Sequence, residues 1–227
     1  IKVSGDDKYE PIYSFGHKDS VRTAAFLQIT TADTNKPLEL SASHLVTIEG
    51  GRHVPASQIN TGDKLIGGFD SEVTSVTNIK TVTRKGIFAP FTASGTIVVN
   101  DIAASNYISF QDSEFIQIGS FHTPISYHWA FHTFNSVHRL IIQMAGIVPE
   151  SYTEEGFSQF AAVPHKIFSW SLRQNPLVFA TLVSLVLPVI TMTWLLELMY
   201  LNPMMIMIVV GIAIFKHSRE KAKKEIA

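Results

Sequence analysis

The stretch Lys85-Gly-Ile-Phe-Ala-Pro-Phe-Thr-Ala-Ser-Gly-Thr-Ile-Val-Val-Asn-Asp-Ile-Ala-Ala-Ser-Asn-Tyr107 carries the strongest fold signal in this chain. Apolar and β-branched residues stand on both sides of a turn signal, Ala93-Ser-Gly95. Thr96–Val99 is a short β-type run directly after that turn. The composition is typical of short strands divided by a turn.

The same pattern extends toward the N-terminus. Further β-type runs are Ala24–Ile29, Leu45–Ile48 and Val73–Thr83. Turn residues separate them at 33–37, 49–51 and 67–68. Many short strands with turn signals at spacings of about 8–12 residues favour an all-β domain. We therefore expect residues 1–112 to form one all-β domain with few or no helices.

Two further motifs precede the opening stretch. They are Leu40-Ser-Ala-Ser-His-Leu45 and the segment from Val54-Pro-Ala to Gly62-Asp63-Lys-Leu65. In this order, the three blocks resemble the C-terminal autoprocessing domain of Hedgehog proteins and its intein relatives, the Hint fold. The first is similar to that family's Thr-x-x-His block, the second to its Gly-Asp turn, and the third to its Ala-Pro-containing segment.

The resemblance implies that the parent protein cleaves itself through a thioester. In this family the nucleophile is an opening cysteine, but the 227 residues contain no cysteine. Lys2-Val-Ser-Gly-Asp6 and Tyr13-Ser-Phe-Gly-His-Lys18 resemble a segment that follows the family's first strands. The module is therefore expected to be truncated at its N-terminus, with the cysteine upstream. The expected partner is the upstream domain of the same polypeptide.

His44 and Ser41 are the candidate catalytic residues that the resemblance implies. An N-to-S acyl shift needs a proton donor for the leaving amide nitrogen and hydrogen bonds that hold the peptide. An imidazole exchanges protons near neutral pH, because its ordinary pKa is about 6.5. His44 fits the donor, and Ser41 fits the hydroxyl that steadies the carbonyl or amide. The alternatives are a structural histidine and a serine that caps a local turn.

The second-step acceptor is expected to differ from that of sterol-transferring relatives. Where those carry an Asp after a Phe-Leu pair, this chain has Gln28, which is no base for a sterol hydroxyl. Where they carry Ser-Cys-Tyr, it has Ser105-Asn-Tyr107. Hydrolysis or transfer to another nucleophile is therefore favoured over a sterol acceptor. Asn106 is followed by more than a hundred residues, so intein-style C-terminal cleavage is not expected.

Residues 113–175 have a different pattern. Apolar positions between 121 and 146 recur with a period near 3.6, which predicts an amphipathic helix that ends at Gly146. We expect this helix to lie on a bilayer, with Tyr127 and Trp129 at the interface. Residues 147–166 have the composition of a linker.

Residues 176–215 are expected to form one or two transmembrane helices. Their only charged residue is Glu197, and about 20 helical residues span the hydrocarbon core of a bilayer. Two spans would be 176–196 and 199–215, and a single kinked span would be 183–215. The basic tail 216–227 is expected in the cytosol. The lipid bilayer is thus an expected partner, and a membrane of the secretory pathway or the cell surface is the expected location.

Composition and histidine spacing leave few other functions. A formal net charge of -1 does not favour nucleic acid as a partner. Without cysteine there is no disulfide or thiolate zinc site, and no cofactor or metal is expected. One alternative is a catalytically inactive Hint-fold membrane anchor. A remote alternative is a histidine-box membrane oxidase, whose candidate ligands would be His122, His128, His132 and His138.

Overall fold

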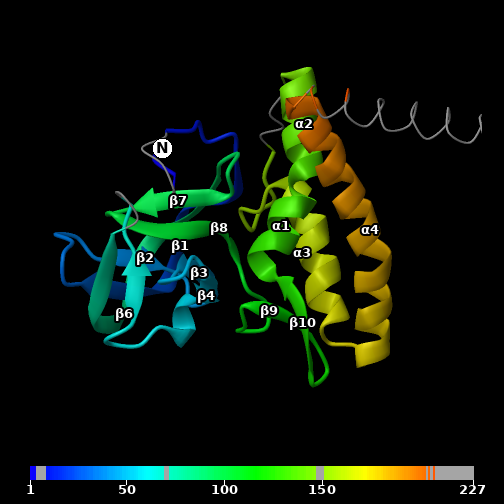
Figure 1. Cartoon of the computed structure of the whole chain (residues 1–227). Helices are drawn as coiled ribbons and strands as arrows, with labels where there is room; N and C mark the ends of the chain where they lie inside the picture. The colour runs from blue at the N-terminus through cyan, green and yellow to red at the C-terminus, as the bar shows by residue number, and fades with distance from the viewer. Residues whose placement is uncertain (4–8, 69–71, 147–150, 203, 205–206, 208–227) are drawn as a thin grey trace, which may run out of the picture.

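A computed structural model describes residues 1–3, 9–68, 72–146, 151–202, 204 and 207 of this chain. A body of β-strands lies on one side and a layer of helices on the other (Figure 1). The strands are β1 Ser14–Thr31, β2 Leu38–Leu40, β3 His44–Thr47, β4 His53–Pro55, β5 Lys64–Ile66, β6 Val73–Phe91, β7 Thr96–Val99, β8 Ile102–Ile108, β9 Phe115–Ile118 and β10 Phe121–Ser126. The helices are η1 Ala56–Gln58, α1 Tyr127–Phe134, α2 Ser136–Ala145, α3 Gln159–Ser171 and α4 Pro176–Leu201.

The first sheet is built on a long antiparallel ribbon of β1 and β6, in the order β2-β1-β6-β5. The predicted runs 24–29 and 73–83 lie inside these two strands, but both strands are much longer. The register shifts between Asp19 and Thr23, where Gly86 stands opposite with φ 95°. Glycine is suited to this conformation because it has no Cβ. The two parts of the β1–β6 ribbon on either side of this shift therefore pair in different registers.

The second sheet, in the order β4-β3-β8-β7, packs on the first. The run 45–48 falls in and beside β3, and the run 96–99 is β7. Residues from both sheets form the first core, and its fully buried members include Ile29, Val46, Leu65 and Ile102. The prediction of a β domain with few helices is therefore confirmed for the described residues, where the 3-10 turn η1 is the helical element before residue 113.

The predicted amphipathic helix at 121–146 is wrong in two respects. Residues 121–126 are strand β10, which pairs with β9, and the helical part divides at Asn135 into α1 and α2. The predicted end is confirmed, because Gly146 caps α2 with φ 65°. In these helices Tyr127 and His138 are buried, whereas Met144 is 71% exposed.

Tyr127 was expected to lie at a membrane interface, but the structure places it elsewhere. It is fully buried in a second core, which joins the β body to the helices. The buried residues of this second core are Leu45, Phe91, Tyr107, Ile116, Tyr127 and Phe179. The hydrophobic pattern identified an amphipathic helix but not its partner, because aromatic contacts from distant strands determine which side is covered.

The expected linker at 147–166 contains the start of a helix. Ser158 caps α3 by accepting a hydrogen bond from the Ala161 N–H, and Pro164 lies inside the helix. Pro164 is the sixth residue of α3 and has no N–H to donate to the carbonyl four residues earlier, so the helix lacks one backbone hydrogen bond there. Residues 147–150 of that segment lie outside the described part of the chain.

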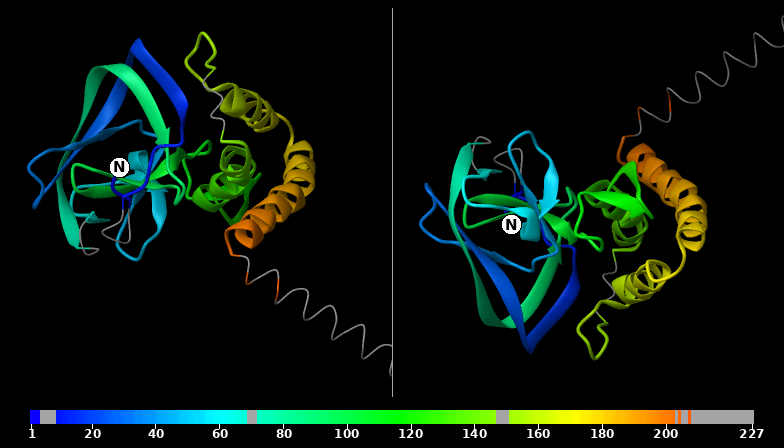
Figure 2. Two further views of the ribbon diagram at one scale, coloured as in Figure 1. Left: turned by 90° about the horizontal axis from the view of Figure 1, so that it is seen from above. Right: turned by 90° about the horizontal axis from the view of Figure 1, so that it is seen from below.

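Helix α4 is long and apolar enough to cross a membrane, by length and composition only. It has 26 residues, and its most apolar 18-residue window has a mean hydropathy of 2.1 with 11% of that window buried. It lies on the side of the helical layer that faces away from the strands (Figure 2). The second predicted span, 199–215, and the tail, 216–227, fall mostly or wholly outside the described residues.

Candidate active site

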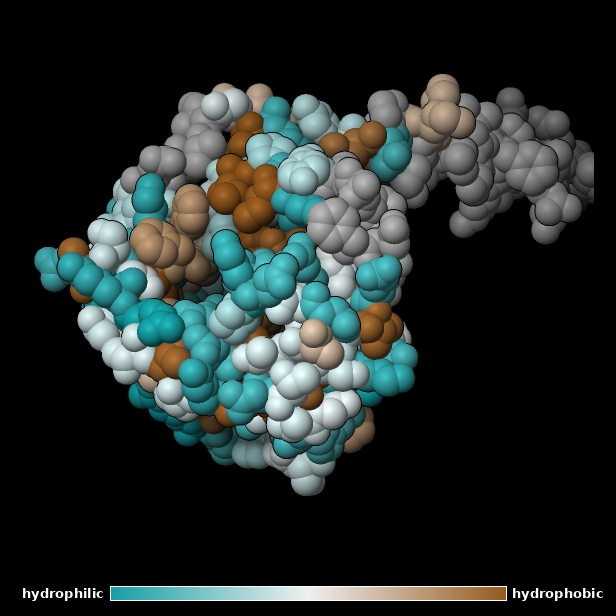
Figure 3. Space-filling model, turned by 90° about the vertical axis from the view of Figure 1, so that its left-hand side faces the viewer, coloured by the Kyte–Doolittle hydropathy of each residue, from teal (hydrophilic) through white to brown (hydrophobic). Residues whose placement is uncertain are grey.

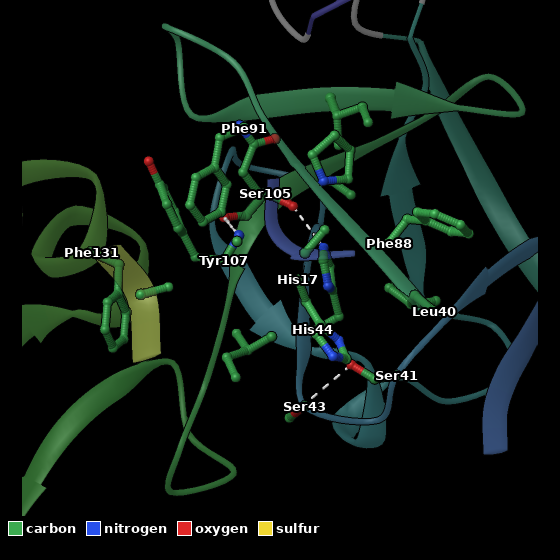
Figure 4. A pocket seen from close by; sticks show the side chains of 18 of the residues that line it. His17, Leu40, Ser41, Ser43, His44, Phe88, Phe91, Ser105, Tyr107 and Phe131 are labelled. Carbon is green, nitrogen blue, oxygen red and sulfur yellow. Dashed lines mark hydrogen bonds between the residues drawn. The ribbon is translucent and has the colours of Figure 1, made fainter. Parts of the chain in front are cut away.

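A cavity of about 520 Å³ lies between the two sheets and reaches the helical layer. His44, Ser41 and Ser43 line the cavity, with Leu40 and Phe88 also at its wall (Figure 4). Aromatic side chains line the part toward the helices, and these include Phe91, Tyr107 and Phe131. The site thus combines a few polar groups with an apolar wall, which is typical of ligand-binding and catalytic pockets.

His44 is held in one tautomer by the strand beside it. It opens β3, and its Nε2 lies 2.7 Å from the Ser105 carbonyl oxygen on β8. A carbonyl oxygen only accepts, so Nε2 carries the proton and Nδ1 presents a lone pair. Desolvation by burial lowers the pKa of His44, and the Ser105 carbonyl partly offsets this effect. His44 is therefore a neutral imidazole at pH 7, able to accept a proton at Nδ1.

Ser41 also lies at the cavity wall, three residues before His44. Its carbonyl oxygen accepts a hydrogen bond from the His44 N–H at 3.0 Å, which closes a tight turn between β2 and β3. Its hydroxyl lies 3.5 Å from the Ser43 hydroxyl, at the limit of a hydrogen bond. This turn brings both predicted residues to one cavity, with the Ser41 hydroxyl only weakly engaged.

Ser105 joins His44 to a group of histidines that the sequence analysis did not place in the site. Its Oγ accepts a hydrogen bond from the Tyr107 N–H at 3.0 Å and lies 2.9 Å from Nδ1 of His128. The hydroxyl proton is therefore free to be donated to His128. One residue thus holds the catalytic candidate by its main chain and helix α1 by its side chain.

Three imidazole rings stack in a column, which we call the histidine column and define as His53, His128 and His132. The rings of His53 and His128 are 3.9 Å apart, and those of His128 and His132 are 6.0 Å apart and nearly parallel. Burial is the main cause that lowers their pKa values, to about 4 for His53, about 3 for His128 and about 4 for His132. The column is therefore uncharged at neutral pH.

Asn106 presents a buried acceptor beside the cavity. Its Nδ2 donates to the Thr92 hydroxyl at 2.8 Å, whereas its Oδ1 has no hydrogen-bond partner among the described residues. Asn106 is the middle residue of Ser105-Asn-Tyr107, the segment compared with Ser-Cys-Tyr in the sequence analysis. An unpaired buried oxygen is costly, so this atom suits a ligand or peptide N–H in the cavity.

Gln28 is engaged on the strand next to the cavity. Its side-chain amide donates to Glu39, the residue opposite it on β2. Arg84 pairs with the same carboxylate at 2.7 Å and is the first cause that lowers the pKa of Glu39, followed by Gln28. Glu39 is thus a saturated, weakly basic carboxylate, although it lines the cavity.

The four histidines of the oxidase alternative do not converge. His128 and His132 share α1, but His122 is exposed on β10. His138 is on α2, where its ring lies between the rings of Tyr13 and Phe160. Over the described ranges, no cluster of three or more His, Asp or Glu has the arrangement of a metal site. The geometry therefore gives the histidine-box hypothesis no support.

The long β1–β6 ribbon, the two packed sheets and the cavity lined by His44 and Ser41 define a two-sheet β module with one candidate active site. Residues 2–173 match the Hint module. The chain therefore belongs to the Hint-module family, and at the level of the family it is an autoprocessing module of the hedgehog and intein-like type. The match includes helices α1 to α3 as well as the strands.

Several relatives agree with this assignment. The Tiggy-winkle hedgehog protein of Danio rerio is 27% identical over 192 residues, which cover 76% of this chain and 43% of that protein. Warthog protein 6 of Caenorhabditis elegans is 31% identical over 106 residues, which cover 43% of this chain and 18% of that protein. The chain thus spans less than half the length of these curated relatives.

Two solved inteins overlap with part of the chain. The VidaL intein has 11% identity and a TM-score of 0.33, covering 40% of this chain and 61% of its own. The gp41-1 intein has 16% identity and a TM-score of 0.30, covering 39% of this chain and 72% of its own.

Proposed function

We propose that this chain is the processing part of a longer polypeptide that cleaves itself through a thioester at the junction preceding the module. A cysteine contributed by sequence before Ile1 is the nucleophile. His44 moves the protons, and Ser41 steadies the scissile carbonyl or amide. The observation that carries the proposal is His44 at the cavity wall, with Nε2 bound to the Ser105 carbonyl and Nδ1 left as the base.

The first step needs only the cysteine thiol, His44 and the scissile peptide. Nδ1 of His44 takes the thiol proton, and the thiolate attacks the carbonyl carbon of the preceding peptide bond. The carbon–nitrogen bond then breaks, and the proton returns from His44 to the leaving amine. The product is a thioester with a free amine at the start of the module. A histidine of lowered pKa suits this step because it is neutral before the reaction.

The second step releases the upstream domain. Water or another small nucleophile attacks the thioester carbonyl, the carbon–sulfur bond breaks, and the thiolate regains a proton. Gln28 is not a base, and Glu39 is saturated by Arg84 and Gln28. This arrangement favours a small acceptor over a sterol hydroxyl that needs a carboxylate to activate it.

We further propose that α4 keeps the module at a membrane. The support is its length and its most apolar 18-residue window, which has a mean hydropathy of 2.1 and is only 11% buried. A secretory or cell-surface membrane fits the hedgehog relatives best. Binding of the chain to lipid vesicles tests this association.

The test extends the chain upstream to the full reading frame and adds dithiothreitol, which intercepts a thioester. We expect thiol-dependent release of a C-terminal piece of about the size of this module. His44→Ala should slow this release by about 10²- to 10⁴-fold, the range for a lost general acid–base. His122→Ala is the matched control, because His122 is exposed on β10 and is not among the residues that line the cavity.

The alternative of an inactive membrane anchor predicts a different result. The full-length protein would remain intact in dithiothreitol although a cysteine stands at the junction. Equal cleavage in the parent and in His44→Ala would also contradict the proposed role of this imidazole. In either case the membrane association could still hold, because it depends on α4.

A further inference from the structure

Helix α4 is attached to the module along most of its length. Its inward residues Phe179 and Ile190 are buried, and Phe179 belongs to the second core. Ser136 on α2 donates to the Thr193 hydroxyl at 3.0 Å. Trp129 on α1 meets Trp194 edge to face, with ring centroids 6.4 Å apart.

A buried ion pair holds the far end of the helix. Arg139 on α2 donates from Nε and Nη2 to the two carboxylate oxygens of Glu197, each at 2.6 Å. The side chains are 3% and 5% exposed. Detaching α4 would take the carboxylate partner away from Arg139, whose side chain is 3% exposed, and breaking a buried ion pair is strongly unfavourable. The attached position is therefore the stable one.

The opposite face of α4 is apolar and uncovered. We call one row of exposed residues on this face the outward stripe, and its residues are Val178, Leu185, Val189, Met192 and Leu196, each more than a third exposed. Their spacings of seven, four, three and four residues place them on one side of the helix. The only charged residue of the helix, Glu197, points into the ion pair. Thr181 and Thr191 each donate to the carbonyl four residues earlier, so these hydroxyls need no water.

A bilayer fits this stripe better than an aqueous partner does. The outward stripe carries no charge along about 27 Å of helix, and hydroxyls satisfied within the helix suit hydrocarbon. The face of the molecule on the β side is instead a mixture of hydrophilic and neutral residues with separate hydrophobic patches (Figure 3). The polarity of the molecule thus differs between its two sides.

An upright crossing is incompatible with the attached helix. From Pro176 to Glu197 the contacts with the module extend over about 31 Å, which equals the hydrocarbon thickness. The β9–β10 hairpin, which contacts the start of α4, would then lie in the hydrocarbon region. This two-stranded sheet has unpaired edges, and open sheet edges are not tolerated in lipid.

From these contacts we propose that α4 lies parallel to the membrane surface while it remains attached to the module, with its outward stripe inserted into one leaflet. The inference rests on the proposed membrane association and gives its geometry. The helix is apolar on all sides because the module covers one face and lipid covers the other. A second copy of the chain on the stripe is the competing occupant.

The first experiment measures depth with spin labels, and the absence of native cysteine makes each label unambiguous. Single-cysteine variants Val178→Cys, Leu185→Cys, Met192→Cys and Leu196→Cys are labelled and bound to phosphatidylcholine–phosphatidylglycerol vesicles. We expect one similar, shallow depth at all four positions. Val21→Cys, which is 72% exposed on β1, is the control that should stay in water.

A depth that rises to the bilayer centre near Leu185 and Met192, and falls toward Val178 and Leu196, would overturn the inference. Labels that are shielded without vesicles, together with a dimeric mass, would overturn it in favour of a second copy. Absence of any vesicle binding would instead defeat the proposed membrane association. The two failures are therefore distinguishable.

The second experiment locks the helix in place. Ser136→Cys with Thr193→Cys places two thiols at positions whose hydroxyls lie 3.0 Å apart, and the oxidised form is isolated after its disulfide has been verified by mass spectrometry. We expect the oxidised and reduced forms to bind vesicles within about 2-fold of each other, since attachment and membrane binding coexist. Loss of binding by 10-fold or more in the oxidised form alone would show that α4 must detach, and would overturn the inference.

Discussion

Ser105 is the residue on which the site is assembled. Its carbonyl oxygen fixes the tautomer of His44, and its hydroxyl contacts His128 of the histidine column. Strand β8 thereby couples the catalytic candidate to helix α1. Small changes in the helices should reach His44 through this one residue.

The histidine column makes stability depend on pH. Burial lowers the pKa values of His53, His128 and His132 to about 4, about 3 and about 4, below the value of about 6.5 expected when unfolded. The unfolded chain therefore binds more protons, and stability that is present above pH 6.5 is lost as the pH falls toward 4. We expect a loss of about 1.4 kcal/mol per histidine and pH unit in this window.

Denaturant unfolding measured between pH 7.5 and 4.5 checks this dependence. His128→Phe keeps an aromatic ring in the column and removes one titrating group. The slope of unfolding free energy against pH should fall by the share of one histidine. A slope unchanged by the substitution would contradict the assignment of the effect to the column.

Gly95 allows the turn after β6 to approach α1 closely. Its φ is 75°, and a Cβ there would lie 2.5 Å from Nδ1 of His132 and 3.2 Å from the Tyr107 ring. Gly95→Ala should destabilise the fold by about 2–4 kcal/mol, from backbone strain and overpacking together. Gly50→Ala is the matched control, because φ is 87° but no atom lies within 4 Å. Equal losses in the two variants would show that the contact contributes nothing.

Helix α4 is fixed to α2 chiefly through Arg139 and Glu197. Glu197→Leu leaves the guanidinium buried without its carboxylate, and we expect a loss of about 3–5 kcal/mol. The double variant Arg139→Leu with Glu197→Leu should recover most of this loss, because replacing both charges by apolar groups is often neutral or better. Thermal unfolding followed by circular dichroism provides the comparison. Additive losses would mean that the pair does not act as a unit.

The molecule is organised around two cores with different dependence on α4. The first core is formed by residues of the β body, whereas Phe179 of α4 takes part in the second. Removing α4 should therefore affect the helices more than the strands. The β body should keep most of its protection against hydrogen exchange.

Truncation after residue 175 tests this division by hydrogen exchange and mass spectrometry. Amides in α1 and α2 should exchange at least 10-fold faster, and those of β3 and β8 should change by less than about 3-fold. A chain that ends at residue 202 keeps α4 and is the control. Equal acceleration in strands and helices would contradict two separable cores.

The β body could be anticipated because strands and turns leave local signals. Alternating β-branched runs and glycine turns located β3, β6, β7 and part of β1, and the turn from Ser41 to His44 was close enough in sequence to be recognised. The lengths of β1 and β6 were underestimated, because cross-strand pairing extends them through polar residues such as Lys18 and Arg84. That pairing is not encoded in a local period.

The rest depends on contacts between distant segments. His44 and Ser105 are 61 positions apart, and Arg139 and Glu197 are 58 apart, so no local pattern relates them. Local periodicity was enough to indicate the β strands and a long apolar helix, because backbone propensity and burial act over a few residues. His44 and Ser41 became candidates through the resemblance of their motif to the Hint family. The tautomer of His44, the histidine column and the attachment of α4 arose from packing, which alone brings such groups within hydrogen-bonding distance.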